Sequence, residues 1–124
     1  MKSKYHSKKI TIDGKTFDSK KEAVRYKELS RLEKAGKIKN LKCQFTYPLI
    51  PAQYEYVTDE KTGKKKRKCV ERACDYIADF VYQDESGHWI VEDVKGYKKG
   101  GAYALFVVKR KLMLHVYGIK VKEV

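Results

Sequence analysis

Residues 9–17, KITIDGKTF, alternate apolar and polar side chains on both sides of Asp13 and Gly14. Asp-Gly pairs readily adopt the positive φ values of a two-residue hairpin turn. Alternating segments that flank such a pair are typical of two short paired strands. The pattern therefore predicts a small β-hairpin near the N-terminus.

A helix is predicted after this hairpin, because Ser19 and Glu22 form a capping box in the stretch Ser-Lys-Lys-Glu. Apolar residues follow at helical spacing: Ala23, Tyr26, Leu29 and Leu32. Gly36 is typical of the position that ends a helix, so we expect this helix to end at about residue 35.

The middle of the chain has the pattern of paired strands. Residues 41–50 are rich in β-forming side chains and are closed by Pro51, and residues 53–57 continue as a second strand. The polar, glycine-containing stretch DEKTGKKKRK that follows has the composition of a hairpin tip. The chain is expected to return through residues 69–82, which makes residues 53–72 a basic hairpin extension.

Residues 88–95 form the next predicted strand, and GYKKGG follows as a loop whose three glycines allow movement. A second helix is expected from about residue 102 to residue 117. Its apolar residues lie on one stripe: Leu105, Val108, Leu112 and Val116. Gly118 stops this helix, and residues 119–124 supply a last short strand.

The predicted order is therefore hairpin, helix, several strands, helix and strand. That order describes an α+β domain in which helices pack on a mixed sheet. With 124 residues and 42% hydrophobic content, the chain suits one compact domain with a modest core. We expect a single domain over residues 1–124.

Charge indicates the kind of partner. Lys and Arg total 29 against 16 Asp and Glu, which gives a formal net charge of +13. That excess is far beyond what solubility requires, so the expected partner is a polyanion. Ten tyrosines supply flat groups that can lie against sugars or bases. Nucleic acid is the favoured partner.

The candidate nucleic-acid-binding residues are concentrated in the hairpin extension. We favour a phosphate clamp for this basic run over an inert, solvated tip. Further lysines lie in the glycine loop and on the second helix. The full set is Lys61, Lys64, Lys65, Lys66, Arg67, Lys68, Lys98, Lys99, Lys109 and Lys111.

Several classes of protein do not fit the chain. No apolar run approaches the roughly 20 residues that span a bilayer, and MKSKYHSKK does not lead into a signal peptide. We expect a cytoplasmic protein without membrane contact. Cys43, Cys69 and Cys74 form no CxxC pair, which argues against a disulfide framework and a structural zinc site.

Acids interrupt two neighbouring strands that are otherwise apolar on both faces. YIADFVY holds Asp79, and WIVEDVKG holds Glu92, Asp93 and Lys95. Ionised groups in a covered sheet must be paired or bind metal. Period-two geometry places Asp93 and Lys95 on one face, about 7 Å apart, while Glu92 points the other way. If Asp79 lies across from them on the adjacent strand, two carboxylates and one ammonium converge.

The first helix can bring a third acid, Glu22, to the same place, although a capping-box Glu also has a purely structural interpretation. Carboxylate oxygens are the ligands that Mg²⁺ and Mn²⁺ prefer. A cation there would acidify a bound water and neutralise charge that develops on a phosphate. We expect Lys95 to act by electrostatic stabilisation rather than as a general base. A plain salt bridge between Asp93 and Lys95 is the alternative interpretation.

Asp79, followed after a turn by Asp93-Val94-Lys95, resembles the D…(D/E)xK signature of the PD-(D/E)XK nuclease superfamily. The stretches FDSKKEAVRYKEL, LKCQFTYPLIP and YIADFVY…IVEDVKG are similar to small phage-encoded endonucleases of that superfamily, which are related to Holliday junction resolvases and transposon-end nucleases. The likeness covers nearly the whole chain. It implies a restriction-endonuclease-like core of helix, three antiparallel strands, helix and strand. It also implies divalent metal at the acids, hydrolysis that leaves a 5′-phosphate, and a bacterial host cytoplasm.

The resemblance assigns roles to individual positions. The implied metal ligands are Glu22, Asp79, Asp93 and the carbonyl of Val94. Lys95 is implied as the catalytic lysine, Gln44 is a weaker candidate, and Glu92 is the alternative to its neighbour as the acid that faces the metal. The chain departs from the commonest motif by Ala78 in place of Pro before the first acid, and by Asp rather than Glu before the x-Lys.

We therefore predict a Mg²⁺- or Mn²⁺-dependent endonuclease that acts on DNA during phage recombination, replication or packaging. Within this class the alternative is a Holliday junction resolvase, which requires a homodimer to cut two strands symmetrically. The alternative from another class is a DNA-binding protein without catalytic activity, whose acids serve structure only. Such a protein would bind DNA with a steep salt dependence and show no effect of metal.

Overall fold

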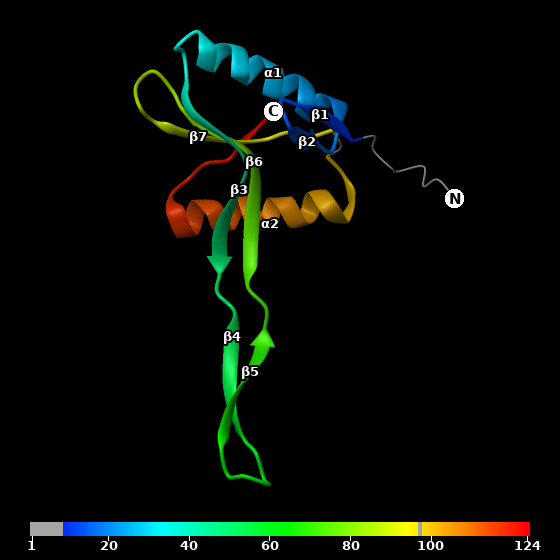
Figure 1. Ribbon diagram of the computed structural model, residues 1–124, viewed down its shortest axis with the longest axis vertical. Coiled ribbons are helices and arrows are strands. Elements are labelled where there is room, and N and C mark those ends of the chain that lie inside the picture. Colours follow the sequence, from blue (N-terminus) through cyan, green and yellow to red (C-terminus); the bar gives the residue numbers. More distant parts are fainter. Residues whose placement is uncertain (1–8, 97) are drawn as a thin grey trace, which may run out of the picture.

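The computed structural model describes residues 9–96 and 98–124 of the chain, and Figure 1 shows a body of helices and strands from which a long two-stranded arm projects. The elements are β1 Ile10–Ile12, β2 Lys15–Phe17, α1 Lys20–Lys34, β3 Lys39–Ile50, β4 Gln53–Thr58, β5 Lys65–Glu71, β6 Cys74–Gln83, β7 Trp89–Asp93, α2 Gly100–Tyr117 and β8 Lys122–Glu123. No described helix is both long enough and apolar enough to cross a membrane.

The N-terminal hairpin and the first helix have the predicted local signals. Asp13 and Gly14 join β1 to β2 with φ values of 52° and 76°, which confirms the two-residue turn. Ser19 caps α1, because its hydroxyl accepts the backbone N–H of Glu22 at 3.1 Å. The helix ends at its C-cap Ala35, as predicted.

The main sheet has the strand order β3-β6-β7-β8. The first three of these strands pair antiparallel, and β8 pairs with β7 in parallel. The order along the chain is thus hairpin, α1, three antiparallel strands, α2 and a final strand, which confirms the predicted α+β class. The final strand is shorter than predicted, because only Lys122–Glu123 pairs in the sheet.

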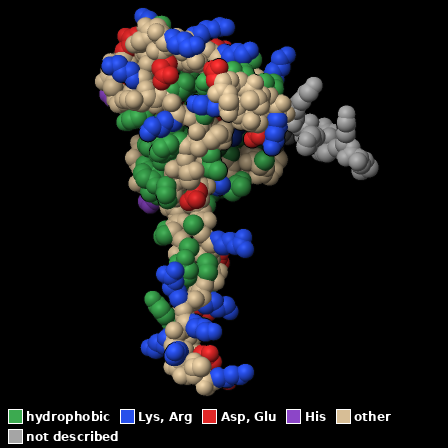
Figure 2. Space-filling view, in the orientation of Figure 1, with side chains coloured by type: hydrophobic (Ala, Val, Ile, Leu, Met, Phe, Trp, Pro, Cys, Tyr) green, Lys and Arg blue, Asp and Glu red, His purple; other side chains and the backbone are tan. Residues whose placement is uncertain are grey.

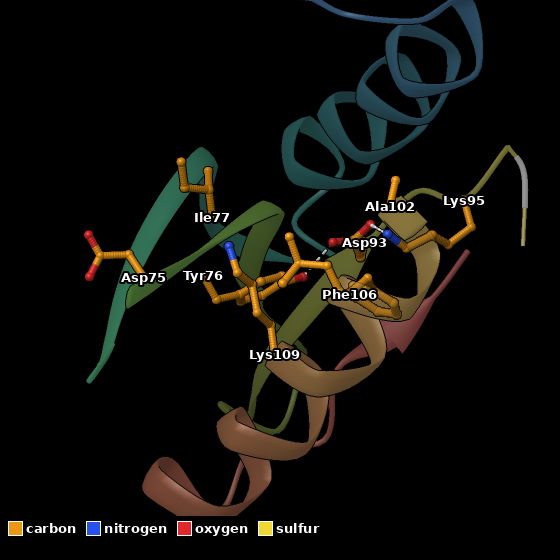
Figure 3. Close-up of a pocket in the computed structure, with 9 residues that line it drawn as sticks. Asp75, Tyr76, Ile77, Asp93, Lys95, Ala102, Phe106 and Lys109 are labelled. Atoms are coloured by element: carbon orange, nitrogen blue, oxygen red, sulfur yellow. Dashed lines mark hydrogen bonds and ion pairs between the residues drawn. The ribbon is translucent and has the colours of Figure 1, made fainter. Parts of the chain in front are cut away.

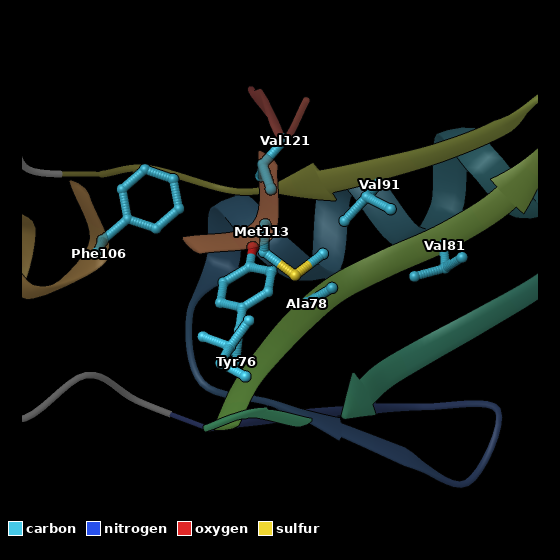
Figure 4. Close-up of a cluster of buried hydrophobic side chains, with 8 residues drawn as sticks. Tyr76, Ala78, Val81, Val91, Phe106, Met113 and Val121 are labelled. Atoms are coloured by element: carbon cyan, nitrogen blue, oxygen red, sulfur yellow. The ribbon is translucent and has the colours of Figure 1, made fainter. Parts of the chain in front are cut away.

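Two clusters of buried side chains cover the two faces of this sheet. The α2-side cluster, shown in part in Figure 4, consists of Leu49, Tyr76, Ala78, Val81, Val91, Phe106, Met113 and Val121. The α1-side cluster consists of Phe17, Ala23, Tyr26, Leu29, Ile38, Phe80 and Tyr82. The sheet is therefore buried between one helix and the other, so a charged group placed in it must find partners there.

The structure corrects two expectations about α2. The helix begins at Gly100, so two of the three glycines expected in a mobile loop belong to its first turn. The predicted apolar stripe coincides only in part with the packing face: Leu112 packs against the α2-side cluster, but Leu105 and Val108 are 55% and 53% exposed, whereas Phe106 and Met113 are buried. Because α2 is apolar on most of its circumference, the spacing alone does not select the face that packs.

The arm consists of β4 and β5, which pair with each other in a separate two-stranded sheet. The predicted single returning strand is interrupted at Arg72 and Ala73, before β6 begins. Every residue of β4 and β5 is exposed. Basic side chains follow the arm along its length in Figure 2. The arm therefore adds nothing to the core of the body.

Candidate active site

The two strands that carry the candidate site, β3 and β6, reverse the faces of their side chains at the level of Asp79. In a regular strand, every second residue lies on the same face. In β6, however, Ala78 belongs to the α2-side cluster and Phe80 to the α1-side cluster. In β3, Phe45 packs against the α2-side cluster and Cys43 against the α1-side cluster. The sheet is therefore distorted where the first candidate acid lies.

Gln44 lies at this reversal with a left-handed backbone, φ 52°. The register on either side places it opposite Asp79. A residue other than glycine in that conformation costs of order 1 kcal/mol and persists only where its surroundings hold it. Here the Gln44 amide nitrogen donates to Glu22 Oε1 at 2.8 Å and lies 3.5 Å from Asp79 Oδ1. The distortion thus places one amide between two candidate carboxylates.

Asp79 is drawn to the end of β7, because its Oδ2 accepts the backbone N–H of Val94 at 2.8 Å. Burial raises the pKa of Asp79 to about 8, and the neighbouring Glu22 and Asp93 carboxyls act in the same direction. The N–H of Val94 opposes this shift without cancelling it. A carboxyl that is buried beside other carboxyls is stabilised when it takes up either a proton or a cation.

Glu22, in the first turn of α1, is 5% exposed. One of its carboxylate oxygens accepts the backbone N–H of Asp18 at 3.2 Å, and the other accepts the Gln44 amide. A capping-box Glu accepts the N–H of the cap residue, here Ser19, whereas Glu22 accepts that of Asp18 and so anchors the start of α1 with only one of its two oxygens. The second oxygen points to the place that Asp79 occupies.

Asp93 and Lys95 form the other half of the site. Asp93 Oδ1 lies 2.7 Å from Lys95 Nζ, and the Tyr76 hydroxyl donates to Asp93 Oδ2 at 2.6 Å. The Lys95 ammonium also lies 3.5 Å from the centroid of the Phe106 ring, a favourable cation–π contact. Figure 3 shows these side chains around a hollow beside α2, which Lys109 also lines. The hollow therefore offers an ammonium and a carboxylate to a bound molecule.

Glu92 faces the opposite side of the sheet and is fully buried. Its two oxygens accept from the Arg25 guanidinium at 2.8 and 2.7 Å, and the Tyr82 hydroxyl donates to it as well. Burial, the largest influence, raises the pKa of Glu92, but Arg25 and Tyr82 outweigh it and the pKa is lowered. This ion pair joins α1 to β7, which gives Glu92 a structural role.

Three residues near the site carry no sequence motif that identifies them. Tyr76 orients Asp93, Arg25 pairs with Glu92, and the Lys21 ammonium donates to the backbone carbonyl of Lys95. Each of these residues lies far in sequence from the group that it contacts, so spacing along the chain does not reveal the contact. Val94, whose carbonyl is the predicted metal ligand, also contacts Asp79 through its N–H.

As the side chains lie here, no group of three or more His, Cys, Asp or Glu in the described residues could hold a metal ion. Glu22 and Asp79 share the Gln44 amide, whereas both oxygens of Asp93 are engaged by Lys95 and Tyr76. The three predicted acids therefore approach one another without forming a closed ligand set.

The predicted nucleic-acid-binding residues do not form one continuous patch. Four of them lie on β5 and two, Lys61 and Lys64, in the turn between β4 and β5, whereas Lys109 lines the hollow and Lys98 and Lys99 immediately precede α2. Lys111 is exposed on α2 itself. Basic side chains are thus found both at the hollow and far along the arm.

Comparison with known proteins gives a family but no activity. The chain belongs to the family described as "Protein of unknown function (DUF1064)", whose model matches residues 2–122. No curated protein and no solved structure matches the chain. Any statement about activity therefore rests on this protein's own residues and their geometry.

Proposed function

We propose that this protein is a divalent-metal-dependent endonuclease that hydrolyses phosphodiester bonds in DNA. The observation that carries the proposal is that the Gln44 amide joins Glu22 to Asp79, while Asp79 accepts the N–H of Val94, the residue between Asp93 and Lys95 in the chain. The element order of helix, three antiparallel strands, helix and strand supports it, because the PD-(D/E)XK resemblance implies the same order. The net charge of +13 supports a nucleic-acid substrate.

The donor chemistry fits a hard divalent cation such as Mg²⁺ or Mn²⁺. Glu22, Asp79 and Asp93 supply only oxygen atoms, which such ions prefer. The raised pKa of Asp79 comes from burial and from neighbouring carboxyls, and a cation at this place relieves both causes. Because Asp93 is engaged by Lys95 and Tyr76, we expect its side chain to exchange a partner when a cation binds.

The protein's own groups have separate roles at the candidate active site. The three acids would hold the ion, which supplies Lewis-acid charge stabilisation and a more acidic water. Lys95, held over the Phe106 ring, directs an ammonium to where charge develops on a phosphate. Tyr76 limits the movement of the Asp93 carboxylate.

The test is incubation of the purified protein with supercoiled plasmid in Mg²⁺, Mn²⁺ or EDTA. We expect nicked and linear products with either metal and none in EDTA. Lys95→Met keeps the aliphatic stem but removes the ammonium, and it should lower the rate by about 10²-fold. The matched control Lys27→Met removes an exposed lysine from α1 and should leave the rate within about threefold.

Two outcomes would reject the proposal. In the first, the protein binds DNA with a steep salt dependence, but the DNA stays intact with every metal. That outcome identifies a non-catalytic DNA-binding protein. The second is equal cleavage by Lys95→Met and the unaltered protein, because the ammonium of the proposed site would then take no part in the reaction.

A further inference from the structure

The arm is built without any contribution to the stability of the body. An isolated two-stranded hairpin is at best marginally stable in water, and such strands usually gain from packing on another element. Yet all residues of β4 and β5 are exposed, including Tyr56 at 73%. An element that exposes aromatic and basic side chains together is typical of a surface that binds another molecule.

The pairing register shows how the arm distributes its charge. Tyr54 and Tyr56 pair with Cys69 and Arg67, and Arg67 lies over the Tyr54 ring at 4.0 Å from its centroid. Residues that pair directly lie on the same face of a two-stranded ribbon. One face therefore carries the two tyrosines with Arg67 and Lys65, and the other carries Lys66 and Lys68 together with Glu55, which pairs with Lys68.

Cations on both faces of a ribbon fit a binding site that has phosphates on both sides. A groove of duplex DNA has this property, whereas a single strand presents phosphates to only one face. The major groove, about 12 Å wide, admits a two-stranded ribbon without deformation of the duplex, whereas the minor groove, about 6 Å wide, accepts strands only where the duplex is bent or the groove widened. None of the salt bridges in the described residues involves a Lys or Arg of β4 or β5, so this charge is free to meet phosphate.

The length of chain between the arm and Asp79 limits how far apart the two can lie. β5 continues through Arg72 and Ala73 into β6, the strand that carries Asp79 (Figure 1). An extended chain rises about 3.3 Å per residue, so Arg67 lies up to about 40 Å from Asp79. One turn of duplex DNA spans about 34 Å. The arm can therefore reach a groove about one helical turn from a phosphate at the hollow.

We propose that the β4–β5 arm inserts into the major groove of duplex DNA about one helical turn from the phosphate held at the candidate active site. This inference rests on the proposed function and names its substrate as DNA that is double-stranded on at least one side of the cut.

The experiment measures binding in EDTA, where cleavage does not occur, to a duplex of about 30 base pairs. The arm variant replaces Lys65, Lys66, Arg67 and Lys68 with Gln. The matched control replaces Lys20, Lys27, Arg31 and Lys34, which are exposed on α1, with Gln, so both variants lose the same charge. Circular dichroism verifies that both variants remain folded.

We expect the arm variant to lose at least about 10²-fold in affinity, and the slope of log K against log salt to become shallower by about 3. The control should lose less than about tenfold. The unaltered protein should protect guanine N7, a major-groove atom, from methylation, and the arm variant should not.

Equal losses of affinity in the arm variant and the control would overturn the inference. So would an arm-dependent affinity for single-stranded DNA equal to that for duplex, without protection of guanine N7. Because metal is absent, the result is independent of cleavage: arm-dependent duplex binding by a protein that does not cleave would reject the proposed nuclease and leave the arm's role intact.

Discussion

Replacing Asp79 with Asn is expected to abolish cleavage and, at the same time, to make the fold more stable at neutral pH. The amide keeps an oxygen that accepts the N–H of Val94, so the local backbone should be retained. The substitution removes one negatively charged ligand from the proposed metal site. We expect this loss of charge to cost about 4 kcal/mol of transition-state stabilisation. The rate of plasmid cleavage should therefore fall by about 10³-fold.

The expected gain in stability follows from the pKa of this carboxyl. The pKa of Asp79 is raised from its ordinary 3.8 to about 8, chiefly by burial. Between those values the folded protein holds a proton that the unfolded chain has lost, so the free energy of unfolding falls as pH rises through this window. The side-chain amide of Asp79→Asn does not titrate, so the free energy of unfolding of this variant does not fall for this reason.

Urea unfolding in EDTA at pH 5 and pH 8 measures this effect. Asp79→Asn should exceed the unaltered protein in stability at pH 8, and the difference should shrink at pH 5. Glu85→Gln, a carboxylate-to-amide change on an exposed turn, is the control and should change neither stability nor cleavage. An Asp79→Asn protein that cleaves at the full rate would contradict the assignment of this acid to the site.

Replacing Arg25 with Met should destabilise the protein more than any change at the hollow. Glu92 is fully buried, and its charge is balanced by the guanidinium that contacts both of its oxygens. Met keeps the aliphatic stem but leaves that charge unpaired, which typically costs about 3–5 kcal/mol. We expect a loss of this size in the free energy of unfolding, measured by urea titration.

A double variant separates the ion pair from simple packing. Arg25→Met combined with Glu92→Leu removes both charges and should recover most of the lost stability. Arg31→Met, which removes an exposed arginine from the same helix, should change stability by less than about 0.5 kcal/mol. If Arg25→Met is no more damaging than Arg31→Met, the ion pair does not hold α1 against β7.

Local signals in the sequence predicted the elements that depend on neighbouring residues alone. The Asp13-Gly14 pair gave the hairpin turn, and the Ser19 cap gave the start of α1. The spacing of Asp93 and Lys95 predicted that they share a face, and they form an ion pair at 2.7 Å. Each of these features is determined by backbone geometry over a few residues.

Features that depend on tertiary contacts were not predictable in this way. The packing face of α2 depends on which of its side chains contact the sheet. Leu105 and Phe106 are both apolar, but only Phe106 is buried. The reversal at Gln44 requires a left-handed residue that no glycine marks. The partner of Glu92 is Arg25, on a helix far earlier in the chain. Contacts between distant segments determine all three.

The most direct test of the proposed site is a crystal structure of the protein with Mn²⁺, with anomalous diffraction used to locate the ion. The proposed site predicts a strong anomalous peak between the carboxylates of Glu22, Asp79 and Asp93. We also expect the Asp93 side chain to have turned away from Lys95 or Tyr76 to reach the ion. The absence of a peak there at saturating Mn²⁺ would contradict the metal site and, with it, the proposed nuclease.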